Sequence, residues 1–201
     1  MTPIAIATED ELSEAIALRL IAELPQPHHI TLKLRKGGFG YLRSKMDNWR
    51  QMAGQQVMLV LTDLDRANCL VEFRSSWLSA KQLPANLLLR VAVREVESWL
   101  LADHVALRAL IGARGHLPAQ PDELPDPKQF LLQLAKSAPK AVREDLIKVA
   151  PGHLAQGLGY NARLSALVNG QWCPERAAER SPSLARARTR LHEAVAAFGQ
   201  G

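Results

Sequence analysis

The segment Val57–Asp65, with the sequence Val-Met-Leu-Val-Leu-Thr-Asp-Leu-Asp, constrains the fold more than any other part of the chain. Its apolar run is typical of a strand that is buried on both faces, as in a parallel sheet covered by helices. The chain that leaves such a strand enters the carboxyl edge of the sheet, where open α/β folds bind their ligands. Asp63 and Asp65 would repel each other there unless a divalent cation lies between them. We therefore expect both acids to bind Mg²⁺, although a loop start or a helix cap would also explain them.

Strand-like and helix-like segments alternate along the first half of the chain. Strands are expected at residues 3–7, 29–34, 57–61 and 87–93, with helical segments between them. This alternation predicts an α/β fold whose mostly parallel sheet is flanked by helices and connected by right-handed crossovers. A proline-rich connector over residues 117–127 is followed by helical patterns alone. We therefore expect an α/β domain over residues 1–116 and an all-helical C-terminal subdomain over residues 117–201 that packs on it.

Acidic residues follow two more of these strands. Glu9 follows the first, inside Thr8-Glu9-Asp10-Glu11, which has the spacing of a capping box with Thr8 as the N-cap. Glu95 follows the fourth, at the point where the strand gives way to a helix. Because the carboxyl ends of parallel strands share one edge, we expect Glu9, Asp63, Asp65 and Glu95 to converge. Alternatively, Glu9 would interact favourably with the positive end of the dipole of the helix that follows it.

The block Arg94–Asp103 is expected to form one continuous helix. In helical register it places Glu95, Trp99 and Asp103 on one face, with Glu97 well round from Glu95. Arg94, Glu97 and Asp103 are therefore expected to support the acidic site. Pairing of Arg94 with a neighbouring acid and burial of Trp99 in the core would explain the same pattern without a function.

A basic stretch surrounds the glycine-rich segment 37–40. Glycines let backbone amides approach a phosphate, and cations with nearby aromatic rings suit a nucleic-acid backbone with exposed bases. The pattern of a Walker phosphate-binding loop is absent, which argues against nucleotide hydrolysis. A flexible turn before a solvated basic helix is the alternative. The cations expected to bind nucleic acid are Lys33, Arg35, Lys36, Arg43 and Lys45, and the interleaved aromatic residues are Phe39, Tyr41 and Trp49.

Composition favours a polyanionic partner in a reducing compartment. The 201 residues carry a formal net charge of +5 at pH 7, which favours a partner such as nucleic acid. Cys69 and Cys173 form neither a disulfide framework nor a metal motif, so we expect a cytoplasmic protein. The chain contains no 18-residue apolar stretch and begins without a basic leader, so neither a membrane span nor secretion is expected.

Four carboxylates beside a basic loop suit metal-assisted attack on a phosphodiester, with one or two Mg²⁺ or Mn²⁺ ions. The arrangement resembles the TOPRIM fold of topoisomerases, primases and overcoming-lysogenization-defect nucleases. In that family a Glu follows the first strand and an Asp-x-Asp follows the third, positions matched here by Glu9 and by Asp63-Leu64-Asp65. Asp10 stands where these enzymes usually have Gly.

The chain is also similar to an uncharacterised bacterial TOPRIM-related family found beside ATPase genes in phage-defence and mobile loci. The resemblance implies a Mg²⁺-dependent nuclease that acts on DNA as an effector with an AAA-type ATPase partner, and it leaves a homo-oligomer open. Glu95 would then be a further ligand or a general base. A non-catalytic nucleic-acid- or protein-binding module is the alternative, and phosphohydrolysis of a small substrate is a third. The similarity is carried by residues 9–15, 37–42, 61–65 and 94–103 and more loosely by 126–128 and 159–161.

Overall fold

The computed structural model describes residues 1–35, 38–64, 70–78 and 83–199 of the chain. It divides into two compact units. Unit 1 comprises Met1–Ala92 together with Arg186–Gly201, and unit 2 comprises Val93–Ala185. The domain boundary expected between residues 116 and 117 stays a prediction.

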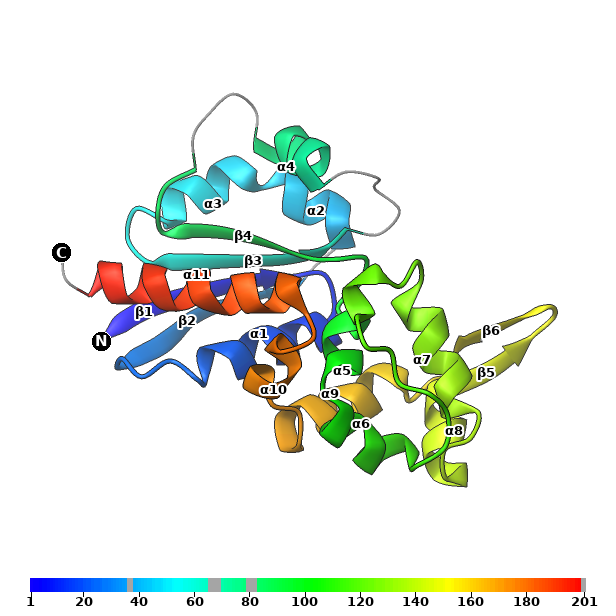
Figure 1. Ribbon diagram of the computed structural model, residues 1–201. Coiled ribbons are helices and arrows are strands. Elements are labelled where there is room, and N and C mark those ends of the chain that lie inside the picture. The colour runs from blue at the N-terminus through cyan, green and yellow to red at the C-terminus, as the bar shows by residue number, and fades with distance from the viewer. Residues whose placement is uncertain (36–37, 65–69, 79–82, 200–201) are drawn as a thin grey trace. The chain divides into compact units, whose positions relative to one another are not determined.

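The core of unit 1 is a four-stranded sheet in which every neighbouring pair of strands is parallel. The strand order is β2-β1-β3-β4, which confirms the expected α/β fold with a parallel, Rossmann-like sheet (Figure 1). The strands are β1 (Thr2–Thr8), β2 (His28–Arg35), β3 (Val57–Asp63) and β4 (Leu87–Ala92).

Burial in the sheet follows the apolar runs of the sequence. Residues 4–8 of β1 are fully buried, and Val57–Leu61 of β3 are at most 1% exposed. Both strands are central and covered on both faces, which is why their sequences are continuously apolar rather than alternating. The edge strand β2 is largely exposed, and Leu32 on it is 41% exposed.

Helices cover both faces of this sheet. The connection from β1 to β2 contains α1 (Glu11–Ile21), whereas α2 (Gly38–Ser44), α3 (Met46–Met52) and α4 (Leu70–Leu78) follow β2 and β3. β2 lies on one side of β1 in the sheet, and β3 and β4 lie on the other side. Right-handed crossovers therefore put α2–α4 on the face of the sheet opposite α1 (Figure 1). The helix α11 (Pro182–Phe198) lies next to α1, where Arg188 Nε donates to Glu23 Oε2 at 2.9 Å.

The N-terminus of α1 differs from the sequence prediction. Asp10 is the N-cap, and its Oδ1 accepts a hydrogen bond from the Ser13 amide at 2.8 Å. Thr8 belongs to β1, where it is in register with Leu61 of β3. The expected capping box with Thr8 as N-cap is therefore wrong, because strand pairing holds Thr8 and moves the cap two residues along the chain.

Unit 2 contains short helices and one β-hairpin. The hairpin is formed by β5 (Ile147–Ala150) and β6 (His153–Gln156), paired antiparallel. The expectation of an all-helical segment over 117–201 is therefore wrong. The turn residue Gly152 has a φ of +77°, a conformation that glycine adopts without strain. The helices are α5 (Glu97–Ala102), α6 (His104–Ile111), the 3₁₀ helix η1 (Pro121–Glu123), α7 (Pro127–Ala135), α8 (Lys140–Leu146), α9 (Tyr160–Gly170) and α10 (Pro174–Ala178).

The block Arg94–Asp103 does not form one helix. Arg94 has a φ of +60°, which is incompatible with a right-handed helix, and α5 begins only at Glu97. Asp103 follows α5 and caps α6 by accepting from the Ala106 amide at 3.2 Å. The predicted face carrying Glu95, Trp99 and Asp103 is therefore wrong.

Within the described residues, none of the helices has both the length and the apolar character needed to cross a membrane.

Candidate functional site

Glu9 and Asp63 meet at the carboxyl edge of the sheet in unit 1. Glu9 Oε1 accepts a hydrogen bond from the Asp63 amide at 3.1 Å and another, shorter one from the Thr62 hydroxyl. Register explains the contact, because Thr8 lies opposite Leu61 and the next residues of β1 and β3 therefore leave the sheet side by side. The two acids are 54 positions apart in sequence, and their proximity was expected from the parallel sheet.

Glu9 and Asp63 lie at the place in the strand order where open α/β sheets bind their ligands. The chain proceeds from β1 to β2 and then crosses to the other side of β1 to form β3. In open α/β sheets, ligands bind outside the carboxyl ends of the two strands at which the strand order reverses. Glu9 follows one of these strands and Asp63 ends the other, so both acids lie at the switch point.

The third acid predicted for this site, Asp65, lies outside the described residues, and so does Lys36. Among the residues that are described, no group of three or more His, Cys, Asp or Glu side chains is arranged to hold a metal ion. Glu95 belongs to unit 2, so its predicted convergence with Glu9 and Asp63 stays a prediction.

Exposed cations flank the same edge of the sheet. Arg35 is in register with Thr8, one residue before Glu9. Lys33 Nζ and Arg35 Nε lie 4.0 and 3.9 Å from the carboxylate of Glu14, and their side chains are 52% and 44% exposed. Ion pairs of this length with largely solvated cations contribute little energy, so both cations are available to an anionic ligand. Arg43 is exposed on α2, and Lys45 immediately precedes α3 and is half-buried.

Two aromatic residues of the basic stretch, Trp49 and Phe39, pack against other parts of unit 1 instead of forming an exposed stacking surface. Trp49 is 3% exposed and donates from Nε1 to the Leu42 carbonyl at 2.9 Å. Phe39 packs against Phe73 and Trp77 of α4, with ring centroids 5.6 and 5.2 Å apart. The expectation that Trp49 presents its ring to nucleic-acid bases is therefore wrong, because the amphipathic α3 turns that ring inward.

Glu95 belongs to a charged cluster in unit 2. Its Oε2 accepts from the Lys128 amide in the first turn of α7 at 3.0 Å, and its Oε1 lies 3.2 Å from Lys128 Nζ. The same ammonium group lies 3.6 Å from Glu97 Oε1. Tyr160, at the start of α9, donates its hydroxyl to Glu97 Oε1 at 2.8 Å.

Glu97 is the most perturbed acid of this cluster. Its residue is 2% exposed, and its Oε2 has no hydrogen-bond partner in the described part of the chain. Burial raises the pKa of Glu97 to about 7, and the nearby Glu95 also raises it, while Lys128 and Tyr160 act in the opposite direction. Burial likewise raises the pKa of Tyr160 above its ordinary value near 10. With a pKa of about 7, Glu97 carries its proton at mildly acidic pH and is about half protonated near neutral pH.

Asp103 and Arg94 have different environments. Asp103 is fully buried, and besides capping α6 it accepts from the Cys173 amide at 2.8 Å and from two nitrogens of Arg176 at 2.7 and 3.0 Å. These contacts tie α5 and α6 to α10 and give Asp103 a structural role. Arg94 is half-buried at the start of unit 2, in the left-handed backbone conformation noted above.

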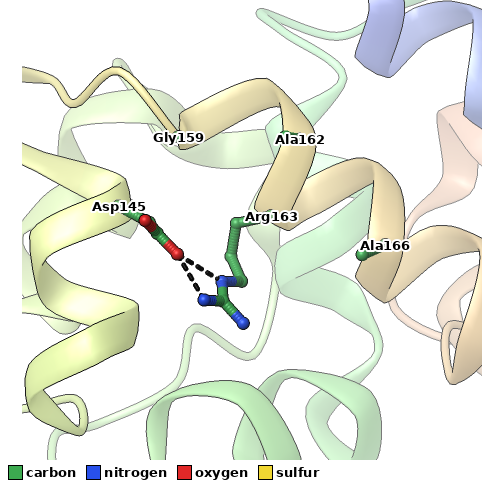
Figure 2. Close-up of a pocket in the computed structure, with 5 residues that line it drawn as sticks. All are labelled: Asp145, Gly159, Ala162, Arg163 and Ala166. Carbon is green, nitrogen blue, oxygen red and sulfur yellow. Dashed lines mark hydrogen bonds and ion pairs between the residues drawn. The ribbon is translucent and has the colours of Figure 1, made fainter.

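A small open pocket of about 230 Å³ lies between α8 and α9 in unit 2. Asp145 and Arg163 form an ion pair across it, and Gly159, Ala162 and Ala166 complete its lining (Figure 2). Because its two charged groups are already paired with each other, the pocket offers little to attract a charged ligand. It contains none of the residues predicted from the sequence to be functional.

Lys128, Tyr160 and Thr62 were not singled out from the sequence. Lys128 and Tyr160 lie in the two short motifs that loosely extended the family resemblance, so a weak signal was present for both. No sequence signal pointed to Thr62, because a hydroxyl at the end of a buried strand is common and its partner Glu9 is 53 residues away. Comparison of the chain with protein-family models, curated proteins and solved structures gives no match.

Proposed function

We propose that the protein is a Mg²⁺-dependent phosphodiesterase that acts on nucleic acid through a TOPRIM-like site on unit 1. The observation that carries this proposal is the contact of the Glu9 carboxylate with the end of β3, which joins two acids at the switch point of the sheet. This position binds ligands in open α/β folds, and here it has cations on the neighbouring strand β2.

The residues at this edge fit a magnesium ion. Mg²⁺ prefers carboxylate oxygens and is usually bound through one or two of them, with water and substrate phosphate oxygens in the other positions. Glu9 and Asp63 meet this requirement, and Asp65 is expected to join them. When bound, Mg²⁺ lowers the pKa of a coordinated water and polarises a phosphoryl oxygen.

The chain's own groups would orient the site and the substrate. The Thr62 hydroxyl and the Asp63 amide fix the Glu9 carboxylate through Oε1. Lys33 and Arg35 would neutralise the phosphate backbone as it crosses the edge of the sheet. The net charge favours unit 1 for this role, because it contains 14 Lys and Arg against 10 Asp and Glu, whereas unit 2 contains 11 against 10.

Plasmid nicking tests this function. The wild type should nick plasmid DNA in Mg²⁺ and lose the activity in EDTA, and Glu9→Gln and Asp63→Asn should each lower the rate about 100-fold or more. Glu9→Gln retains an oxygen that can accept from Thr62 and Asp63, so the fold should persist. Glu193→Gln on α11 is the matched control. The C-terminal end of α11 lies beside Thr2, at the amino end of β1, whereas Glu9 and Asp63 lie at the carboxyl ends of the strands. Nicking that continues undiminished in both site variants would remove the enzyme assignment.

A non-catalytic module is the second candidate, and one observation favours it. Glu9 Oε1 already accepts two hydrogen bonds, so Glu9 could serve as a structural link between β1 and β3. Under this alternative, Glu9→Gln and Asp63→Asn bind DNA as the wild type does, and no condition yields cleavage. The ATPase partner and the role in phage defence remain predictions from the family resemblance.

A further inference from the structure

The carboxylate of Glu14 lies between the two cations of β2 that the proposed function assigns to the substrate. Glu14 is in the first turn of α1. Its Oε1 lies 4.0 Å from Lys33 Nζ, and its Oε2 lies 3.9 Å from Arg35 Nε, so each carboxylate oxygen faces one cation. An acid in the first turn also interacts favourably with the helix dipole, but that role requires no cation beside it.

Strand register puts both cations on one face of the sheet. After the register shift in the first half of β1, its pairing with β2 is regular up to Thr8, which lies opposite Arg35. Lys33 precedes Arg35 by two residues in this regular part, so the two side chains point to the same face. Glu14 of α1 lies within 4.0 Å of both, so this is the face that α1 covers.

The two cations are more accessible than the acid between them. The side chains of Lys33 and Arg35 are 52% and 44% exposed, whereas the side chain of Glu14 is 18% exposed. A ligand that arrives from the solvent therefore reaches the cations first. Both ion pairs are long, so little is lost when another anion replaces the carboxylate. A phosphodiester group offers two non-bridging oxygens and one negative charge, as the carboxylate does.

We propose that Glu14 occupies the position of a substrate phosphate between Lys33 and Arg35, and thereby lowers the affinity of the protein for DNA. A phosphate of the DNA backbone displaces the carboxylate and takes over both cations. An isolated phosphate gains little by this exchange, because one anion replaces another, whereas DNA adds further contacts along its backbone. This inference rests on the proposed function in that it takes DNA as the substrate, and it adds a residue that limits binding.

Fluorescence anisotropy with a short labelled DNA duplex tests the proposal. Binding is measured in EDTA, which prevents metal-dependent cleavage, over a range of salt concentrations. Glu14→Gln should tighten binding about fivefold at low salt, because no ion pair then has to be broken. It should also steepen the decrease of log K with log salt by about one, because a displaced Glu14 takes up a cation from solution and offsets one that the DNA releases.

Glu193→Gln is the matched control, because it likewise removes an acid from an ion pair with an arginine, here Arg190 at 2.7 Å on α11. It should leave the affinity close to that of the wild type. A double-mutant cycle gives a second control. When Lys33 and Arg35 are both replaced by Gln, the additional substitution Glu14→Gln should no longer tighten binding. Urea unfolding of each variant establishes that the fold is retained.

Weaker binding by Glu14→Gln would overturn the proposal, because it would show that the acid orients the cations for the substrate. An affinity equal to that of Glu193→Gln would overturn it as well. Plasmid nicking by the wild type in Mg²⁺, measured in parallel, separates the two proposals. Tightening without nicking supports this inference alone, and nicking without tightening supports the catalytic function alone. Absence of DNA binding by every variant would overturn this inference whatever the nicking assay shows.

Discussion

The protonation of Glu97 links folding stability to pH. Its side chain is buried beside Glu95 and Lys128, and burial raises its pKa to about 7 from an ordinary value near 4.5. The folded protein therefore retains a proton that the unfolded chain loses above about pH 4.5. The stabilisation from this group is complete below that pH and declines as the pH rises, until it is lost above about pH 7.

We expect this decline to amount to at most about 3.5 kcal/mol, since each pKa unit corresponds to about 1.4 kcal/mol. Glu97→Gln retains an acceptor for Tyr160 and removes the titration. Urea unfolding of the wild type and of Glu97→Gln at pH 5, 6.5 and 8 should show the variant gaining relative stability as the pH rises. Glu144→Gln, at an exposed position on α8, should follow the wild-type dependence. Parallel curves for wild type and Glu97→Gln would contradict the prediction.

Single residues differ in how far sequence predicts their roles. The contact of Glu9 with Asp63 could be predicted because strand direction and register alone bring the two positions together. The burial of Glu97 and Asp103 could not, since it depends on α9 and α10, which lie more than 60 residues further along the chain. Local pattern identifies an acid, whereas tertiary packing decides whether it binds a ligand, holds a proton or caps a helix.

At the scale of elements, the long apolar strands were predictable and the short elements were not. β1 and β3 are recognisable because burial on both faces requires continuous apolar runs. The hairpin lies in the segment that was expected to be all-helical, because four-residue strands carry too few positions to show a period. The break at Arg94 is likewise invisible in the sequence, since arginine favours helices and seldom adopts a positive φ.

The return of the chain from the hairpin depends on Gly157. A Cβ atom at this position would lie 2.3 Å from the Asp145 carbonyl oxygen, closer than any real Cβ contact. Gly157→Ala should therefore displace the base of the hairpin and accelerate amide exchange over Ile147–Gln156, as measured by hydrogen–deuterium exchange. Gly170→Ala is the control, because a Cβ at that helical position meets open space. Unchanged protection of the hairpin in Gly157→Ala would contradict this account.

At the scale of the whole molecule, the two units should respond separately to a core mutation. Leu191 of α11 is 1% exposed and belongs to unit 1. Leu191→Ala should destabilise unit 1 by about 2–5 kcal/mol, the usual cost of truncating a buried leucine. Hydrogen exchange should then accelerate in β1–β4, while the amides of α5–α9 should change much less. Equal acceleration throughout the chain would show that the two units unfold together.

The discontinuity of unit 1 has a consequence for how the protein is made. Residues 1–92 emerge from the ribosome early, yet α11, which completes the same unit, is synthesised last. Residues 93–185 can therefore acquire their structure while the nascent sheet still lacks one of its covering helices. A stop codon or a stalled ribosome near residue 185 would leave the strands with uncovered apolar surface, which is an aggregation hazard and a target for chaperones.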